Sequence, residues 1–261
     1  MSEIIFLGTA GAVASGERDN TSLLIRSKND LILIDAAGGL VKKLAQVNLD
    51  FRMLSQIFLT HGHPDHIYGL VSLLHSQYGL KNKVHIFAHQ KVIGLVKTLR
   101  RIFKLTDTTK FPEVIYHKIE ANPKISFYNS PWLAVYAFKV RHTSESLGFR
   151  FLFKSINKSC VFSGDTARES NLIKVSSGCD YLIHDCFAPE RYFKKYPQLK
   201  RMHTSSLSLG EIASESNVKV LVPIHFASEV KYSIREIIKE IKRNFSGKLI
   251  IPSDLQALKI N

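Results

Sequence analysis

A chain of 261 residues with 45% hydrophobic content is long enough to bury a full core, and one domain is the starting expectation. Lys and Arg number 36 against 22 acidic residues, so the net charge of +14 favours an anionic partner such as nucleic acid. No stretch approaches 18 consecutive apolar residues, no signal-like segment opens the chain, and three cysteines lack any CxxC spacing, so we expect a reduced, cytoplasmic protein with no membrane association.

The first third of the chain predicts short strands and two helices. β-rich runs at 2–8, 21–27 and 30–36 open the sequence, the last two separated by the turn-like Lys28-Asn29-Asp30. A helix is predicted at 38–47, a buried strand at 56–60, and a second helix at 65–78.

Strands and helices continue to alternate through the rest of the chain. After a strand at 84–88, residues 91–104 predict a helix whose apolar residues share one arc, namely Val92, Leu95, Val96, Leu99, Ile102 and Phe103. Strands and turns are predicted over 113–163, then strand 180–185, helix 205–216, strand 218–225, helix 230–243 and strand 248–252. Two β-rich halves, each with helices, favour an α/β fold of the four-layer αββα sandwich type, as a single domain over 1–261.

One loop carries an unusual density of metal-binding side chains. His61, His63, Asp65 and His66 lie within six residues, between a buried strand and a helix. Neutral imidazole and carboxylate are common zinc ligands. Because neighbouring side chains diverge, these four cannot close one tetrahedral shell, so they predict two metals.

Further ligands must come from other strand ends. His142, Asp165 and His225 each stand where an apolar run stops. Taken singly, each is an ordinary polar residue at a strand end, but together with the loop they complete a seven-ligand set. The sequence therefore predicts a metal-dependent hydrolase.

Several segments resemble the metallo-β-lactamase superfamily and, within it, ribonuclease Z and its relatives. They are FLGTAGAVASGERDNTSLLI, the acidic turn at Asp35, THGHPDH, RHTSESLGFRF, SGDT, LIHDCF, HTSS and PIHF. The resemblance implies one zinc held by His61, His63 and His142, a second held by Asp65, His66 and His225, and Asp165 as the bridge. It implies two Zn²⁺ per chain, with manganese or iron as alternatives, and a metal-activated hydroxide as nucleophile.

The resemblance also implies residues for proton transfer. Asp65 orients the attacking water as well as binding metal, and His203 protonates the leaving alkoxide. The relatives orient that histidine with a glutamate, whereas this chain has the shorter Asp185. A solvent-exposed capping histidine is the alternative for His203.

The tRNA-gripping arm of the long relatives is missing, because His142 and Asp165 are only 23 positions apart. Armless relatives include arylsulfatases and small phosphodiesterases. Charge points toward RNA, since residues 81–118 hold nine Lys or Arg against two acids. We expect substrate contacts from one helix face, formed by Lys97, Arg100, Arg101 and Lys104; a merely solvated face is the alternative.

Three hypotheses follow from these features. The first is a ribonuclease Z-like phosphodiesterase or endoribonuclease, involved in tRNA processing or acting on another RNA or a nucleotide ester. The second is a hydrolase of small sulfate, phosphate or carboxylic esters. The third is an inactive nucleic-acid-binding relative, which the complete ligand set disfavours. A homodimer is common among such relatives.

Overall fold

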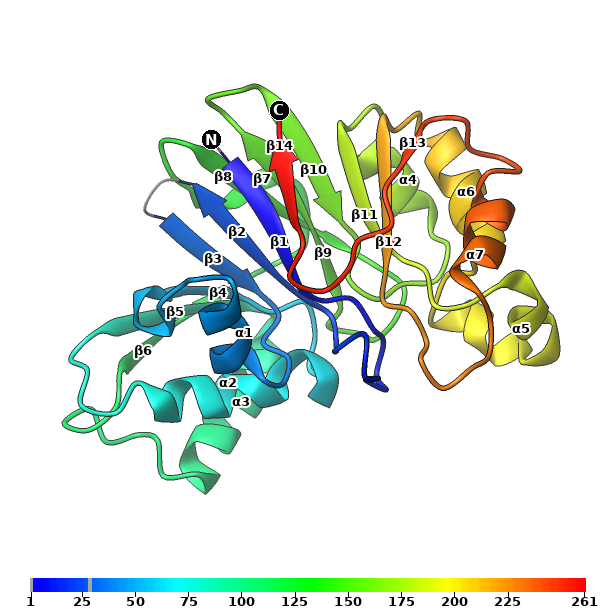
Figure 1. The fold of residues 1–261 in the computed structure, drawn as a ribbon. Coiled ribbons are helices and arrows are strands. Elements are labelled where there is room, and N and C mark those ends of the chain that lie inside the picture. Colours follow the sequence, from blue (N-terminus) through cyan, green and yellow to red (C-terminus); the bar gives the residue numbers. More distant parts are fainter. Residues whose placement is uncertain (1, 28–29) are drawn as a thin grey trace. The chain divides into compact units, whose positions relative to one another are not determined.

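The computed structural model describes residues 2–27 and 30–261. These residues form two compact units, one from 2–12, 16–119 and 253–261 and the other from 13–15 and 120–252 (Figure 1). Of the turn predicted at Lys28-Asn29-Asp30, the first two residues lie outside the described part, and Asp30 begins a strand.

The first unit contains a seven-stranded mixed sheet in the order β14-β1-β2-β3-β4-β5-β6. Strands β3 to β6 run parallel to one another, so their carboxyl ends meet at one edge. The strands are β1 (Ser2–Gly8), β2 (Ser22–Ser27), β3 (Asp30–Ile34), β4 (Gln56–Phe58), β5 (Lys83–Ala88), β6 (Glu113–Lys118) and β14 (Ala257–Ile260).

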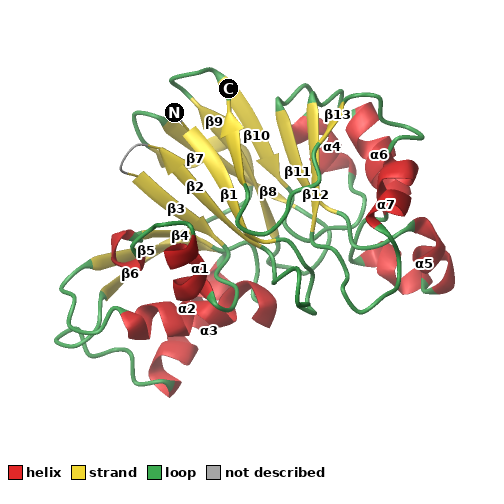
Figure 2. Ribbon diagram, in the orientation of Figure 1, coloured by secondary structure: helices red, strands yellow, loops and turns green. Residues whose placement is uncertain are grey.

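Helices cover one face of this sheet (Figure 2). They are α1 (Leu40–Gln46), the short 3-10 helix η1 (Phe51–Met53), α2 (Pro64–Ser76) and α3 (Gln90–Ile102), which confirm the three helices predicted here. Leu33, Ile57 and Ile86 of the sheet share a buried core with Leu70 of α2 and Val92 of α3. Helix α2 begins at a proline, whose fixed φ suits the first helical position.

The second unit has its own seven-stranded mixed sheet, in the order β13-β12-β11-β10-β9-β8-β7. Strands β10 to β13 are parallel, and β7 to β10 pair antiparallel. The strands are β7 (Asn122–Asn129), β8 (Leu133–Lys139), β9 (Leu147–Phe153), β10 (Lys158–Phe162), β11 (Tyr181–Asp185), β12 (Val220–Ile224) and β13 (Lys248–Leu249). Strands β9 and β10 fill the interval between His142 and Asp165, so no arm is inserted there.

Helices pack on this sheet through a second apolar core, in which Val161, Leu182 and Leu221 meet Leu209 and Ile237. The helical elements are α4 (Ser170–Ser176), α5 (Glu190–Lys195), the 3-10 helix η2 (Pro197–Arg201), α6 (Ser206–Glu215) and α7 (Ile234–Ile241). Helix α7 begins later than predicted because Ser233 caps it. Each unit therefore consists of one sheet with its own set of helices, which confirms the α/β class that the sequence predicted.

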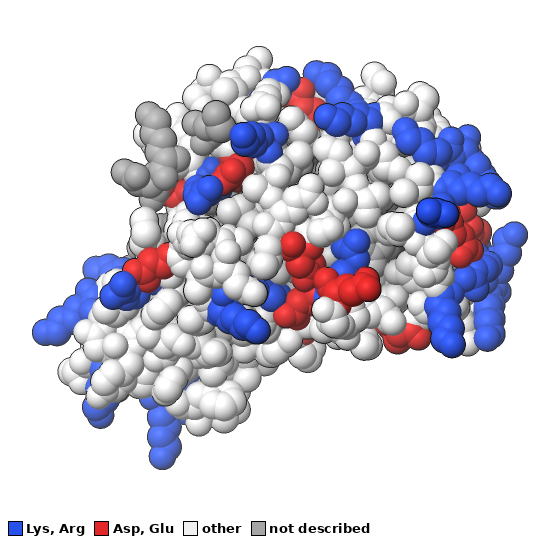
Figure 3. All heavy atoms as spheres, in the orientation of Figure 1, with Lys and Arg blue, Asp and Glu red and all other residues white. Residues whose placement is uncertain are grey.

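Basic side chains are abundant on the surface. On the face drawn in Figure 3, Lys and Arg gather over α5 to α7 with fewer acidic groups between them. Within the described part of the chain, no helix combines the length and apolarity that crossing a bilayer requires.

Candidate metal centre

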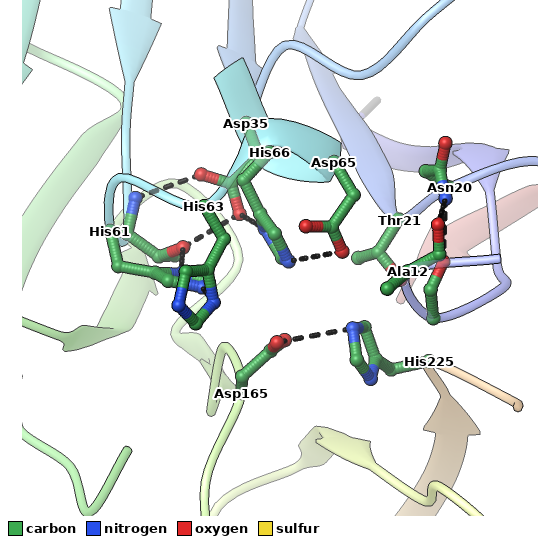
Figure 4. Close-up of polar contacts among 12 residues, drawn as sticks. Ala12, Asn20, Thr21, Asp35, His61, His63, Asp65, His66, Asp165 and His225 are labelled. Carbon is green, nitrogen blue, oxygen red and sulfur yellow. Dashed lines mark hydrogen bonds and ion pairs between the residues drawn. The ribbon is translucent and has the colours of Figure 1, made fainter. Parts of the chain in front are cut away.

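The first unit places its predicted ligands at the carboxyl end of its parallel strands. Residues 59–63 lead from β4 to α2, and Asp65 and His66 lie in the first turn of that helix. Figure 4 shows these side chains turned toward one another. The edge where parallel strands end is the usual site for ligands in α/β proteins.

Two close pairs occur among the four predicted ligands of this unit. His61 Nε2 lies 2.9 Å from His63 Nδ1, and His66 Nε2 lies 3.4 Å from an Asp65 carboxylate oxygen. Two such pairs are compatible with the two metals that the sequence predicted.

Asp35, at the carboxyl end of β3, fixes the orientation of these ligands. One of its carboxylate oxygens accepts hydrogen bonds from His66 Nδ1 at 2.7 Å and from the Thr60 hydroxyl at 2.8 Å; the other accepts from the Thr60 amide at 2.8 Å. The Thr60 hydroxyl oxygen in turn lies 3.0 Å from His61 Nδ1. These contacts favour a proton on Nδ1 of both imidazoles, which is the tautomer that a metal bound at Nε2 would require.

The second unit gathers its ligands in the same way. Strands β10, β11 and β12 are parallel, so their carboxyl ends meet at one edge of the sheet. This edge carries Asp165 shortly after β10, Asp185 at the end of β11 and His225 directly after β12. An Asp165 carboxylate oxygen, Oδ2, lies 3.1 Å from His225 Nε2 and 3.8 Å from His142 Nε2 (Figure 4 for the first pair). A single carboxylate oxygen between two histidines is the geometry expected of a bridging ligand.

His142 is held in the metal-binding form. Its Nδ1 donates to the Met202 carbonyl at 2.9 Å, which leaves Nε2 directed at Asp165. Burial lowers the pKa of His142 despite the nearby charge of Asp165, so the imidazole is neutral at neutral pH. Neutral imidazole is the form that binds zinc.

Asp185 and His203 form a hydrogen-bonded pair. Asp185 Oδ2 accepts from His203 Nδ1 at 2.9 Å, so the shorter acid does reach this histidine. Burial opposes ionisation of Asp185, but the charge of His203 and its hydrogen bond outweigh it and hold the pKa of Asp185 below its ordinary value. The His203 ring stacks on Phe187 with centroids 4.5 Å apart and lies 5.0 Å and 5.3 Å from the His142 and His225 rings.

The three cysteines are excluded as ligands. Cys160, Cys179 and Cys186 are buried free thiols, and burial raises the pKa of Cys179 to about 12. None of the three belongs to a cluster of possible metal ligands among the described residues.

The exposure predicted for the basic helix face holds for three of its four residues, although one of them, Lys104, lies beyond the end of α3. Lys97, Arg101 and Lys104 are exposed, but Arg100 is only 8% exposed. Arg100 donates to the Tyr116 hydroxyl at 3.0 Å and to the Leu105 carbonyl at 2.8 Å. The Leu105 carbonyl belongs to the segment that follows the end of α3, and the Arg100 guanidinium satisfies it. Arg100 therefore ties α3 to β6 and the following turn.

Residues 2–231 match the family described as "Anti-Pycsar protein Apyc1". The chain belongs to this family. It is also 26% identical to ribonuclease Z of Picrophilus torridus, covering 95% of this chain and 93% of the relative, and 24% identical to that of Methanosarcina mazei, covering 100% and 98%.

Solved structures establish the fold. The metallo-β-lactamase fold protein YhfI from Bacillus subtilis superposes with a TM-score of 0.82 at 20% identity, covering 98% of both chains. The short form of human tRNase Z superposes with a TM-score of 0.80 at 20% identity, covering 99% of both. The chain is thus a metal-dependent hydrolase, a ribonuclease Z-like member of the metallo-β-lactamase superfamily, as its motifs predicted.

Proposed function

We propose that this protein is a phosphodiesterase that hydrolyses nucleotide phosphodiesters. The observation that carries the proposal is the Asp185–His203 pair, which lies against the rings of the predicted ligands His142 and His225. A sugar alkoxide is a poor leaving group and needs a proton as it departs, whereas the phenolate of an aryl sulfate needs little. A histidine placed to donate a proton, His203, therefore favours a phosphodiester with a sugar leaving group over an aryl ester as the substrate.

We infer two zinc ions, arranged as the resemblance implies. His61, His63 and His142 would hold one, and Asp65, His66 and His225 the other, with Asp165 shared. The two pairs in the first unit and the shared carboxylate oxygen in the second each support this division. Such ions supply an activated water and neutralise charge on the phosphate; Asp65 would also help to orient that water.

The lack of an arm bears on the size of the substrate. The match to the Methanosarcina mazei enzyme runs over 310 aligned positions while covering all of this chain's 261 residues, so that relative has insertions that this chain lacks. A substrate held without an arm fits a small nucleotide ester. RNA is the second candidate, supported by the relatives' name and by exposed Lys97, Arg101 and Lys104, which we propose attract phosphates.

Four substrates test the proposal on the zinc-loaded protein. We expect hydrolysis of a dinucleoside monophosphate and of bis(p-nitrophenyl) phosphate, and little of p-nitrophenyl sulfate. Cleavage of a precursor tRNA at a comparable rate would make RNA the substrate. If the aryl sulfate is hydrolysed and neither small phosphodiester is, the proposal is wrong.

We also propose a homodimer formed through α2 and α3. An apolar groove of about 730 Å³ begins at Gly62 in the metal-binding loop and runs between these helices. Leu95 and Phe103 line this groove and were predicted to pack inward, but they are 37% and 55% exposed, and Ile102, next to Phe103 in the sequence, is 65% exposed. One patch thus offers both a groove and protruding side chains, as a two-fold interface requires. Light scattering should give a dimer that Phe103→Glu dissociates; a monomeric wild type would refute it.

A further inference from the structure

A cleft of about 480 Å³ lies in the first unit, between the second half of α3 and strand β6. It is lined by Gly94, Lys97, Arg100, Arg101, Thr106 and Tyr116. Three of these residues are cations and none is an acid. The sequence predicted an exposed basic arc here, whereas the structure forms a positively charged recess.

The three cations have only neutral partners among the described residues. Arg100 donates to the hydroxyl and carbonyl oxygens named above, and Arg101 donates to the Thr98 hydroxyl at 3.3 Å. Lys97 Nζ lies 4.9 Å from the centre of the Tyr116 ring, which is a cation–π contact. Contacts of this kind orient a cation but leave its charge uncompensated.

The acids that follow α3 in the sequence are compensated by other lysines. Asp107 pairs with Lys110 at 3.0 Å, and Glu113 pairs with Lys83 at 3.4 Å. The carboxyl end of α3 itself contributes a negative partial charge of about half a unit. Three full positive charges exceed that contribution, so the cleft favours an anion.

One wall of the cleft is fixed before any ligand binds. Arg100 is 8% exposed, and its bonds to β6 and to the segment after α3 hold its guanidinium in place. Lys97 and Arg101 are exposed and four positions apart, so successive turns of α3 place them on one face. A ligand would therefore order two side chains against a third that is already ordered, which limits the entropy lost on binding.

The cleft is separate from the metal centre. Helix α3 begins just after the carboxyl end of β5, at the sheet edge that carries the metal-binding loop. A helix rises about 1.5 Å per residue, so Arg101 lies roughly 16 Å along α3 from that edge. No predicted metal ligand lines the cleft. A small ligand bound there would not reach the metals.

We propose that this cleft is a second, non-catalytic site that binds a phosphate dianion, either inorganic phosphate or the phosphate of a mononucleotide. A phosphate monoester carries a charge of about −1.5 to −2 at neutral pH, whereas a phosphodiester carries a single charge. Three uncompensated cations therefore favour the monoester. Hydrolysis of a phosphodiester yields a monoester, so the cleft prefers the class of the product to that of the substrate.

NMR titration of the zinc-loaded protein tests the proposal. Because metal ions also bind phosphate, the amide signals of the cleft residues, and not those of the metal-binding loop, report on this site. Inorganic phosphate and uridine 5′-monophosphate should shift these signals, and dimethyl phosphate, which carries one charge, should bind at least roughly 10-fold more weakly. Tighter binding of the mononucleotide than of inorganic phosphate would support the site and identify the nucleotide as its ligand. Equal binding would support a site for the phosphate group alone.

Two kinds of variant locate the binding. Lys97→Met and Arg101→Gln should each weaken phosphate binding at the cleft roughly 10- to 100-fold, because each loses one charged hydrogen-bonding group. Lys42→Met is the matched control, since Lys42 is equally exposed but lies on α1. A Cβ at Gly94 would meet no atom within 4 Å, so Gly94→Trp should fill the cleft and abolish binding without removing a charge.

Three results would overturn the proposal. The first is an absence of phosphate-induced shifts at the cleft of the wild type. The second is equal affinity in the wild type, both charge variants and Gly94→Trp. The third is dimethyl phosphate binding as tightly as inorganic phosphate. None of these results depends on hydrolysis, so the site and the proposed function are tested separately.

Discussion

Replacing Asp35 with asparagine should weaken the metal centre without touching a ligand. In Asp35→Asn only the amide oxygen of the side chain can accept hydrogen bonds, whereas both carboxylate oxygens of Asp35 do so. If the amide oxygen keeps the bond from the Thr60 amide, the NH₂ group faces His66 Nδ1. The imidazole must then carry its proton on Nε2, the atom that has to bind metal. If the amide is flipped, its NH₂ meets the buried Thr60 N–H instead. Either way at least one charge-assisted hydrogen bond is lost, at about 1.5–3 kcal/mol.

That cost corresponds to roughly 10- to 100-fold weaker zinc binding, the usual effect of removing such a partner. Competition with a chromophoric chelator measures it. Asp180→Asn is the matched control: Asp180 is also buried and accepts from the Ser159 amide at 2.9 Å and from Lys219 at 2.8 Å, but none of these partners is a predicted ligand. Unchanged zinc affinity in Asp35→Asn, or an equal loss in the control, would refute the reasoning.

Three further predictions concern catalysis, RNA and pH. His203→Ala should keep its metal but lose about 10²- to 10⁴-fold in turnover of a dinucleoside monophosphate, and less with a p-nitrophenolate leaving group; equal losses would remove it as the proton donor. Lys97→Glu and Arg101→Glu should each flatten the log–log salt dependence of RNA binding by about 0.7 to 0.9 unit, whereas exposed Lys42→Glu should not; no difference from that control would mean a merely solvated face. Burial raises the pKa of Asp180, but its hydrogen bonds outweigh this and hold the pKa below the ordinary 3.8. The ionised Asp180 therefore stabilises the fold above that pH, and this stabilisation is lost as the pH falls. The free energy of unfolding of Asp180→Asn should consequently decrease less steeply with acid than that of the wild type. An equal decrease in both proteins would contradict this role of Asp180.

The sequence was most informative where a motif requires a strand end. The ligand loop, Asp165 and His225 follow apolar runs, and the structure places them at the carboxyl edges of parallel strands. Asp35 likewise is an acidic residue that closes an apolar strand, but the motifs assign it no role. A hydrogen bond across the 31 positions between Asp35 and His66 cannot be inferred from spacing.

Helix α3 shows the limit of periodicity. An angle of 100° per residue identifies a face, but not what that face meets. Arg100 lies on the predicted basic arc and still turns inward, because the turn at Leu105 offers a carbonyl. Leu95, Ile102 and Phe103 lie on the apolar arc and nevertheless remain exposed. Short helices such as α4 and α5 escaped prediction, since seven or six residues give too few turns for a pattern.

Metal content tests the central claim most directly. Elemental analysis of the zinc-loaded protein should give about two ions per chain, because the two predicted ligand pairs and the shared carboxylate would serve two sites. Asp165→Ala should lose both metal and activity, since the residue contacts histidines of both sites. One ion per chain or fewer in the wild type, or an Asp165→Ala protein that still holds two, would contradict the account.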